Sequence, residues 1–327
     1  MQNKIDLAGI IPPIATPFDE KGNIDHTALA RNVARLSQTG ISGVLVLGSN
    51  GEYPYLSEAE KREAVKTVAA ATPDNMVVMV GSGCESTRET IRLTNDCAAM
   101  GAHAALVVTP CYYGGKMTPA ALEDHFVQVA GQADIPVLLY NVPKFTNINI
   151  DLATVLKLSR HPNIVGIKDS SGNVAQLGEI LARIDDGFQV LVGTAGALLA
   201  ALSLGCPGGI LALANVAPSE CVQIQRLLTA GETSEARDLQ LKMLPVNRAV
   251  TAAFGIAGLK AAMDMLGYVG GEPRSPLLPL DETAREELKT ILQTAGLISS
   301  DQSSEGQPSE ARMSEDRVPT SKYKRPA

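Results

Sequence analysis

The chain of 327 residues contains no tryptophan and few other aromatic side chains, five phenylalanines and seven tyrosines. Base-stacking platforms and aromatic sugar-binding surfaces need such rings, so neither is indicated. Acidic side chains outnumber basic ones by 35 to 28, and the net charge of -7 argues against nucleic acid as the main partner. No uncharged apolar run reaches membrane length. We therefore expect no nucleic-acid partner and no membrane partner.

Metal-binding and nucleophile motifs are also missing. The five cysteines are scattered, with no CxxC pair and no histidine at ligand spacing, so reduced thiols are expected rather than a zinc site. There is no HExxH, no GxSxG elbow and no Walker loop. His103 and His125 fall at the end or on the face of predicted helices and are interpreted as structural. We expect neither a metal ion nor a cofactor.

The N-terminal residues lack the charged-then-apolar pattern of a secretion signal and the Arg/Ser-rich pattern of a transit peptide. A cytoplasmic location is therefore expected. About 45% of the residues are apolar, enough for a sizeable core.

What the sequence does contain is a repeated unit, in which a short apolar run is followed by a polar loop and a helical pattern. The runs lack the polar alternation of half-exposed strands, as expected for parallel strands that are covered on both faces. Eight such runs occur, at residues 9–15, 43–48, 76–81, 104–109, 136–140, 164–168, 188–193 and 208–212.

The helical patterns between these runs carry start signals. Residues 57–60 (SEAE) and 86–89 (STRE) are capping boxes, in which a hydroxyl and a carboxylate each satisfy a free amide. Thr118 precedes a first-turn proline, and Asp151 is positioned to cap the next helix. Eight strand–helix units in roughly 220 residues predict an α/β fold of the (β/α)8 TIM barrel type. An open doubly wound sheet is the alternative, but no GxGxxG turn follows the first strand.

Three segments are expected along the chain. The barrel takes residues 1–219, and further helical patterns at 232–250 and 255–267 predict a C-terminal helical extension over residues 220–298. Residues 299–327 have almost nothing to bury, so we expect a disordered tail there. An interaction role for this tail is the alternative to a merely solvated end.

In a (β/α)8 barrel the chemistry belongs at the C-terminal ends of the strands. Lys168 closes the apolar run 164–167, and a lysine in a buried strand is rare without a partner or a task. An apolar barrel mouth disfavours the ammonium form, which favours a nucleophilic amine. The alternative is that the strand simply ends there and the side chain reaches solvent or pairs with Asp169. Position alone leaves both interpretations open.

Other strand ends supply further candidates. Tyr140 ends the fifth run, where its phenol could move a proton beside an imine or could pack as a hydrogen-bonded core residue. Ser49, Asn50 and Gly51 form a tight turn whose amides and hydroxyl are suited to a carboxylate, although turn geometry alone also explains them.

Four motifs taken together resemble the dihydrodipicolinate synthase / N-acetylneuraminate lyase family over roughly residues 5–297. They stand in order at successive strand ends: GSNGE at 48–52, VTPCYY at 108–113, YNVP at 140–143 and GIKDSSG at 166–172. Within this family, GSNGEYPYL, GSGCEST, VTPCYY, HPNIVG and FGIAGLK are similar to 4-hydroxy-2-oxoglutarate aldolases.

The resemblance implies a metal-independent class I aldolase, which is a pyruvate-dependent carbon–carbon lyase. Lys168 would form the Schiff base, Tyr140 would relay protons, and Ser49 and Tyr112 would complete the relay. The remaining implied site residues hold the keto acid or leave room for it: Ser49, Asn50, Gly51, Ser170 and Gly193. The family also implies a homo-oligomer, a tetramer or a dimer, and related aldolases include mitochondrial ones.

One position departs from the family pattern. Synthases that condense pyruvate with aspartate semialdehyde carry an arginine two residues after YNVP, and here that residue is Phe145, preceded by Lys144. An aromatic ring cannot replace a bidentate guanidinium. We therefore expect cleavage of 4-hydroxy-2-oxoglutarate to pyruvate and glyoxylate. The alternatives are 4-hydroxy-tetrahydrodipicolinate synthesis, cleavage of a 2-keto-3-deoxy sugar acid, and a non-enzymatic ketoacid sensor.

Overall fold

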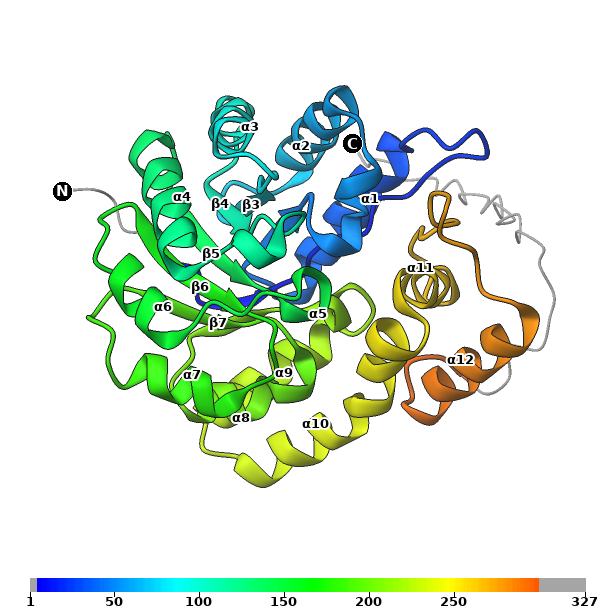
Figure 1. Cartoon of the computed structure of the whole chain (residues 1–327). Coiled ribbons are helices and arrows are strands. Elements are labelled where there is room, and N and C mark those ends of the chain that lie inside the picture. The colour runs from blue at the N-terminus through cyan, green and yellow to red at the C-terminus, as the bar shows by residue number, and fades with distance from the viewer. Residues whose placement is uncertain (1–4, 300–327) are drawn as a thin grey trace, which may run out of the picture.

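The computed structural model describes residues 5–299, in which eight parallel strands form one sheet surrounded by helices (Figure 1). Each strand pairs with its neighbours in the order β1-β8-β7-β6-β5-β4-β3-β2. The strands are β1 (Gly9–Ile11), β2 (Gly43–Val46), β3 (Val77–Gly81), β4 (Ala104–Val108), β5 (Val137–Asn141), β6 (Ile164–Asp169), β7 (Gln189–Val192) and β8 (Gly208–Ile210).

The sheet closes on itself between β1 and β2. Pro13 forms a parallel bridge to Leu45, and the amide of Ile14 donates to the Leu45 carbonyl at 3.0 Å. The (β/α)8 TIM barrel predicted from the sequence is therefore confirmed, and all eight predicted strands are present. β1 is shorter than predicted because Pro12 and Pro13 have no N–H to donate to a neighbouring strand.

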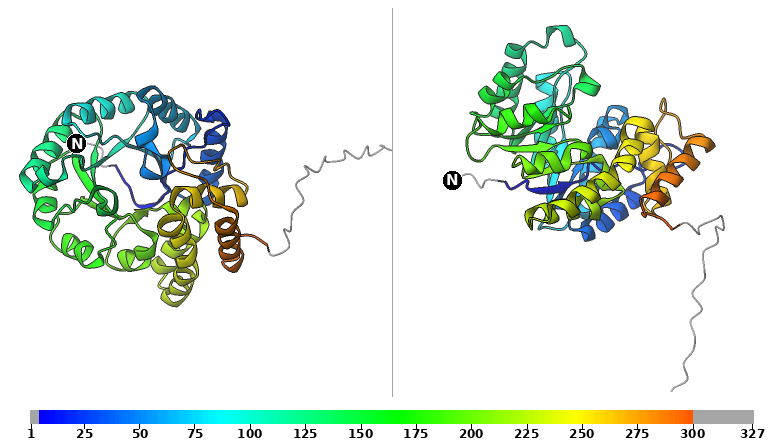
Figure 2. Two further views of the ribbon diagram at one scale, coloured as in Figure 1. Left: turned by 45° about the vertical axis from the view of Figure 1, so that its right-hand side comes forward. Right: turned by 90° about the horizontal axis from the view of Figure 1, so that it is seen from below.

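Helices surround the strands and give the molecule its ring-shaped outline (Figure 2). They are α1 (His26–Leu36), α2 (Glu58–Ala71), α3 (Thr87–Ala99), α4 (Pro119–Gln132), α5 (Pro143–Thr146), α6 (Leu152–Leu158), α7 (Val174–Leu181), α8 (Leu198–Ser203), α9 (Pro218–Thr229), α10 (Thr233–Arg248), α11 (Gly255–Met265) and α12 (Glu282–Thr294).

The predicted helix caps at Ser57, Thr118 and Asp151 are confirmed, and the capping box at Ser86 is confirmed in part. Ser57 and Glu60 form the complete capping box at the start of α2. At α3, Ser86 accepts from the amide of Glu89, but the Glu89 carboxylate binds the Arg92 guanidinium instead of the cap amide. A nearby cation thus outcompetes a neutral amide for that carboxylate.

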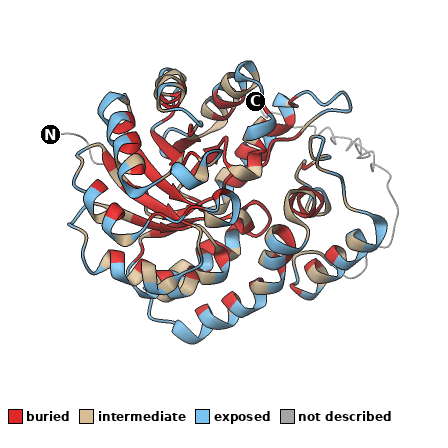
Figure 3. Cartoon of the chain, viewed as in Figure 1, coloured by how far each residue is buried: buried red, intermediate tan, exposed pale blue. Residues whose placement is uncertain are grey.

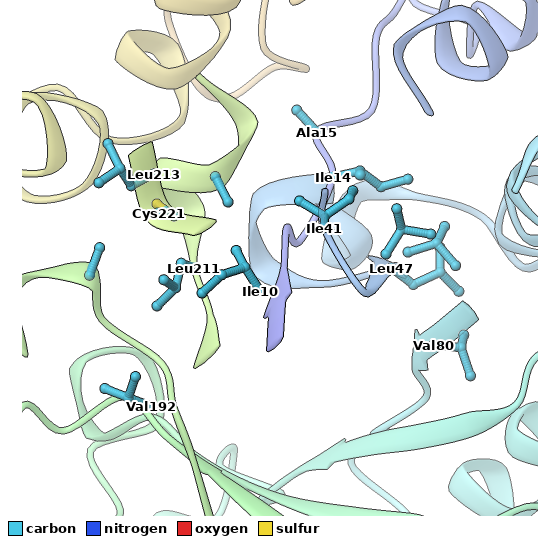
Figure 4. Packing of buried hydrophobic residues seen from close by; sticks show 14 of the residues in the cluster. Ile10, Ile14, Ala15, Ile41, Leu47, Val80, Val192, Leu211, Leu213 and Cys221 are labelled. Atoms are coloured by element: carbon cyan, nitrogen blue, oxygen red, sulfur yellow. The ribbon is translucent and has the colours of Figure 1, made fainter. Parts of the chain in front are cut away.

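Apolar side chains form two layers, because successive residues of a strand point to opposite faces. One cluster packs the strands against the helices, and Figure 4 shows part of it, including Ile10, Val80 and Val192. The alternate residues form a second cluster that includes Ile11, Leu45 and Met79. The strands are accordingly mostly buried, whereas the helices expose one face (Figure 3). Polar groups at the barrel mouth therefore stand on a rigid, filled barrel.

The C-terminal helices α10, α11 and α12 lie together at one side of the ring (Figure 2). The expected boundary between barrel and extension, at residue 219/220, falls within α9, and α9 packs on α8 and α10. The predicted tail, apart from residue 299, lies outside the described residues. Within residues 5–299, no helix is both long and apolar enough to cross a membrane.

Candidate active site

The C-terminal ends of β5 and β6 bring two of the predicted site residues side by side. Tyr140 and Lys168 are direct partners in the strand register, and both side chains are largely buried, with 7% and 4% exposed. The Lys168 Nζ lies 4.2 Å from the centre of the Tyr140 ring. An amine and a phenol that face the same interior can act on one bound molecule.

The residues next in the chain lock these two strand ends together from the opposite face. Asn141 pairs with Asp169 in the register, and its amide donates to the buried Asp169 carboxylate at 2.8 Å. The backbone N–H and the hydroxyl of Ser171 donate to the other oxygen of that carboxylate. Asp169 is therefore held by neutral donors behind the strand, and the sequence-based alternative in which it pairs with Lys168 is not observed.

A cavity of about 660 Å³ opens above Lys168 and Tyr140. It is lined by the ends of β5, β6 and β7, by the loop after β2, and by a wall from the C-terminal helices. Its position agrees with the rule that barrel chemistry sits at the C-terminal ends of the strands. The volume is that of a site for a small molecule.

The loop after β2 places Ser49 and Asn50 in the lining of this cavity, while their roles toward substrate stay predictions. Both belong to the short 3-10 helix η2 (Ser49–Gly51). Gly51 is buried and is not one of the lining residues; its carbonyl accepts from the Thr16 hydroxyl at 2.7 Å, which fixes the loop to the chain after β1. The expected contact of Gly51 with substrate stays a prediction.

Ser170 and Gly193 also line the cavity, and the Ser170 side chain occupies the space that a side chain at residue 193 would need. The Ser170 hydroxyl is buried and has no hydrogen-bond partner among residues 5–299. A Cβ on residue 193 would lie 1.9 Å from that hydroxyl oxygen, so only glycine fits there. Gly193 thus makes room first for Ser170 and only indirectly for a keto acid. Buried unpartnered hydroxyls are uncommon and call for an explanation, which a bound ligand would supply.

Tyr112 is not part of this cavity. Its side chain is 79% exposed, and its ring packs edge-on against that of Tyr113. The Glu85 carboxylate accepts the backbone amides of Cys111 and Tyr112 and so fixes the loop in this direction. A single chain does not bring Tyr112 to Lys168, so its predicted part in the proton relay stays a prediction.

One wall of the cavity was missed by the sequence analysis. It is the π-helix η7 (Ala249–Ala253), which continues α10, and with its flanks it contributes Asn247, Thr251 and Phe254 to the lining. Insertions of this kind are frequent at functional sites. The available signal was Pro245 inside the predicted helix 232–250, because proline removes a helix hydrogen bond.

Lys144 and Phe145 stand at the rim, on α5. The Lys144 ammonium donates to the Thr251 carbonyl at 3.3 Å and so reaches across to the π-helix wall. Phe145 is 58% exposed and borders a neighbouring cavity of about 540 Å³ as well. Tyr53 lines that second cavity, and burial raises its pKa to about 12, so its phenol is neutral. The ring of Phe145, at the position where the family pattern has an arginine, therefore lies at the site and carries no charge.

Among the described residues, no three His, Cys, Asp or Glu side chains come together in a way that could hold a metal ion. The Cys84 and Cys111 thiols line the neighbouring cavity, and burial raises the pKa of both. These two thiols are therefore poor nucleophiles, since the thiolate is the reactive form.

The chain is similar to proteins of one family over most of its length. The family model described as the dihydrodipicolinate synthetase family matches residues 6–295. A 4-hydroxy-tetrahydrodipicolinate synthase of Methanothrix thermoacetophila is 37% identical over 285 residues, covering 87% of this chain and 95% of the relative.

Solved structures of the same kind superimpose closely. Dihydrodipicolinate synthase from Bacillus anthracis has a TM-score of 0.85 at 32% identity, covering 88% of this chain and 98% of that one. The chloride-inhibited dihydrodipicolinate synthase from Acinetobacter baumannii, in complex with pyruvate, has a TM-score of 0.85 at 30% identity, covering 90% and 100%.

Proposed function

The chain belongs to the dihydrodipicolinate synthetase family, and from that premise we propose that it is a class I aldolase acting through an imine on Lys168. The observation that carries the proposal is the register pairing of Lys168 with Tyr140 at the floor of a cavity that Ser49 also lines. An amine is the nucleophile that imine chemistry requires, and a phenol and a hydroxyl beside it can move the protons.

The proposed reaction splits a 4-hydroxy-2-keto acid. Neutral Lys168 attacks the ketone, and loss of water gives a protonated imine that withdraws electrons. Tyr140 relays the proton of the 4-hydroxyl group, its phenol oxygen accepting that proton while its own passes to the Ser49 hydroxyl or to water. The C3–C4 bond breaks, and its electron pair moves into an enamine while the aldehyde leaves. Protonation at C3 and hydrolysis then release pyruvate and restore the amine.

Our first candidate substrate is 4-hydroxy-2-oxoglutarate, which gives pyruvate and glyoxylate. Phe145 supports it, because this position holds no arginine for the carboxylate of aspartate semialdehyde. The second candidate is condensation of pyruvate with aspartate semialdehyde. It is favoured by the relatives, since those at 32–37% identity are named 4-hydroxy-tetrahydrodipicolinate synthases.

The deciding experiment compares both reactions in one preparation. Pyruvate release from 4-hydroxy-2-oxoglutarate is followed with lactate dehydrogenase and NADH, and pyruvate consumption is followed with aspartate semialdehyde. Lys168→Ala is the control in both. Pyruvate release by the wild type and not by Lys168→Ala supports the first candidate. Pyruvate consumption with aspartate semialdehyde, without release from 4-hydroxy-2-oxoglutarate, supports the second. Turnover by Lys168→Ala in either assay would contradict the proposal as a whole.

We also propose a homo-oligomer, as the family resemblance implies. Light scattering after gel filtration measures its mass. A species of 34.3 kDa, the mass of one chain, would contradict this part.

A further inference from the structure

The Asp169 carboxylate is a buried acidic group that no cation pairs with inside residues 5–299. The residue is 1% exposed, and none of the ion pairs in that part of the chain includes it. The side-chain amides of Asn141 and Gln176 donate to one of its oxygens at 2.8 and 3.3 Å, and Ser171 donates twice to the other. Burying such a group is costly unless hydrogen bonds hold it. An apolar residue would avoid this cost, so the carboxylate needs an explanation.

Asn141 is the central partner of this carboxylate and is fully engaged. Its side-chain amide donates one proton to Asp169 and the other to the side-chain oxygen of Asn149, both at 2.8 Å. Its own side-chain oxygen accepts the backbone N–H of Ile150 at 3.0 Å. Gln176 on α7 closes the network, because it accepts from Asn149 at 3.1 Å and donates to the Ile150 carbonyl at 3.2 Å. Since an amide offers two protons and one oxygen, these bonds fix the orientation of Asn141.

The network lies beyond a point at which β5 and β6 change register. The shift is near the start of the strands, at Val165 of β6, which has no partner in β5. Without this bulge, Tyr140 would stand opposite Ile167 instead of Lys168. Bulges re-aim side chains and are frequent beside active sites. The pairing of the amine with the phenol therefore depends on the shifted register.

The bond between Asn141 and Asp169 holds the shifted register. The two residues stand opposite each other, one position beyond the phenol and the amine. A slip of one strand by one residue would separate them, and it would also turn the side chains of that strand to the other face. Backbone bonds fasten the same two residues, because the Asn141 carbonyl accepts from Ser170 at 2.8 Å and the Asp169 carbonyl accepts from Gly193 at 2.6 Å.

We propose that Asn141 and Asp169 are positioning residues for the imine chemistry, because their bond locks the register that sets the Lys168 amine beside the Tyr140 phenol. This inference rests on the proposed function and adds two residues that do not line the cavity. Displacement of a reacting group by about 1 Å can slow a reaction about 10²-fold. Loss of the bond therefore slows imine formation more than it weakens the binding of pyruvate.

The test measures how fast pyruvate is trapped on the enzyme. Enzyme and pyruvate are mixed, quenched with borohydride at short times and analysed by mass spectrometry, and the rate is expressed per folded molecule from circular dichroism. Asp169→Asn keeps the shape of the side chain but turns one N–H group toward another donor. We expect the maximal trapping rate to fall about 10²-fold and the half-saturating pyruvate concentration to change less than about 3-fold.

An exchange variant tests whether the pair itself matters. Asn141→Asp combined with Asp169→Asn again sets an amide opposite a carboxylate, with the two roles exchanged. It should recover at least about 10-fold of the lost rate, because the two positions are coupled. An exchange variant as slow as Asp169→Asn would overturn the proposed pairing.

Asn163→Ala is the matched control. Asn163 precedes β6 and donates to the carbonyls of Ala130, Ala133 and Ile135, so it fastens the opposite end of the same strand. We expect this variant to be less stable and to trap pyruvate at the wild-type rate. An unchanged maximal rate in Asp169→Asn, or an equal fall in Asn163→Ala, would overturn the positioning role and leave the imine chemistry intact.

A milder variant keeps the test decisive if Asp169→Asn does not fold. Asn149→Ala removes one acceptor of Asn141 at an exposed position, and it should slow trapping by about 3–10-fold. An unchanged rate there would overturn the inference. Absence of any trapped pyruvate in the wild type would overturn the proposed function and this inference together.

Discussion

Glu52 and Lys260 form an ion pair of 2.7 Å although 208 residues separate them and both side chains are at most 1% exposed. Lys260 also donates to the Glu272 carbonyl, and the backbone amide of Arg274 donates to the second Glu52 oxygen. Glu52 itself has φ of 56°, an uncommon conformation for a side-chain-bearing residue. The pair therefore fastens the loop that carries Ser49 to the C-terminal helices.

Breaking this pair should be costly. Burial lowers the pKa of Lys260 and the Glu52 carboxylate opposes that shift, so the charged form of Lys260 is stabilised by its partner. Lys260→Met leaves the Glu52 carboxylate buried without its partner, and we expect the free energy of unfolding to fall by about 3–5 kcal/mol. Urea unfolding measures this. Adding Glu52→Gln to Lys260→Met should recover part of the loss, and a double variant as unstable as the sum of the two singles would contradict the coupling.

Tyr140→Phe should separate imine formation from carbon–carbon cleavage. The phenyl ring keeps the packing beside Lys168, whereas the group that accepts the 4-hydroxyl proton is lost. We expect turnover to slow by about 10²–10⁴-fold, the usual effect of losing an acid/base group. Borohydride trapping of pyruvate by this variant should persist. Tyr113→Phe, which alters an exposed phenol, is the control, and equal turnover by both variants would exclude Tyr140 from the relay.

Ser170→Ala should make the protein more stable and should weaken its binding of pyruvate. The buried hydroxyl has no partner within residues 5–299, so removing it should raise the free energy of unfolding by about 1 kcal/mol. If this hydroxyl serves a bound keto acid, the half-saturating pyruvate concentration should rise by about 5–10-fold. Denaturant titration and imine trapping test the two effects. Lower stability with unaltered trapping would mean that the hydroxyl serves the fold.

His125 should make the fold sensitive to acid. Burial lowers its pKa from 6.5 to about 4, and its Nδ1 lies 2.9 Å from the Thr87 hydroxyl. Between pH 6.5 and 4 the unfolded chain binds a proton at this residue and the folded chain does not. Stability is therefore lost as the pH falls through this window, by about 3 kcal/mol from this group.

The measurement for this prediction is the free energy of unfolding from pH 7 to pH 4. His125→Phe should flatten the slope, whatever its stability at pH 7. His26→Gln, which changes an exposed histidine, should keep the wild-type slope. Parallel curves for the wild type and His125→Phe would show that other groups set the acid sensitivity.

The sequence by itself determined the barrel and the place in it of Lys168, the proposed nucleophile. Continuous apolar runs and helix caps are local signals, and both the number of units and the place of Lys168 near the end of the sixth strand could be read from them. Ser49 and Tyr140 were placed by the same rule, because parallel strands of a closed barrel all end at one mouth.

Only the tertiary structure decided what surrounds these groups. The pairing of Glu52 with Lys260, the reach of Lys144 to Thr251 and the outward direction of Tyr112 depend on contacts between distant segments. No local pattern encodes such contacts, since each is set by how whole helices pack on the barrel. The wall formed by the π-helix η7 arises in the same way, and with it the shape and size of the cavity in which Lys168 would act.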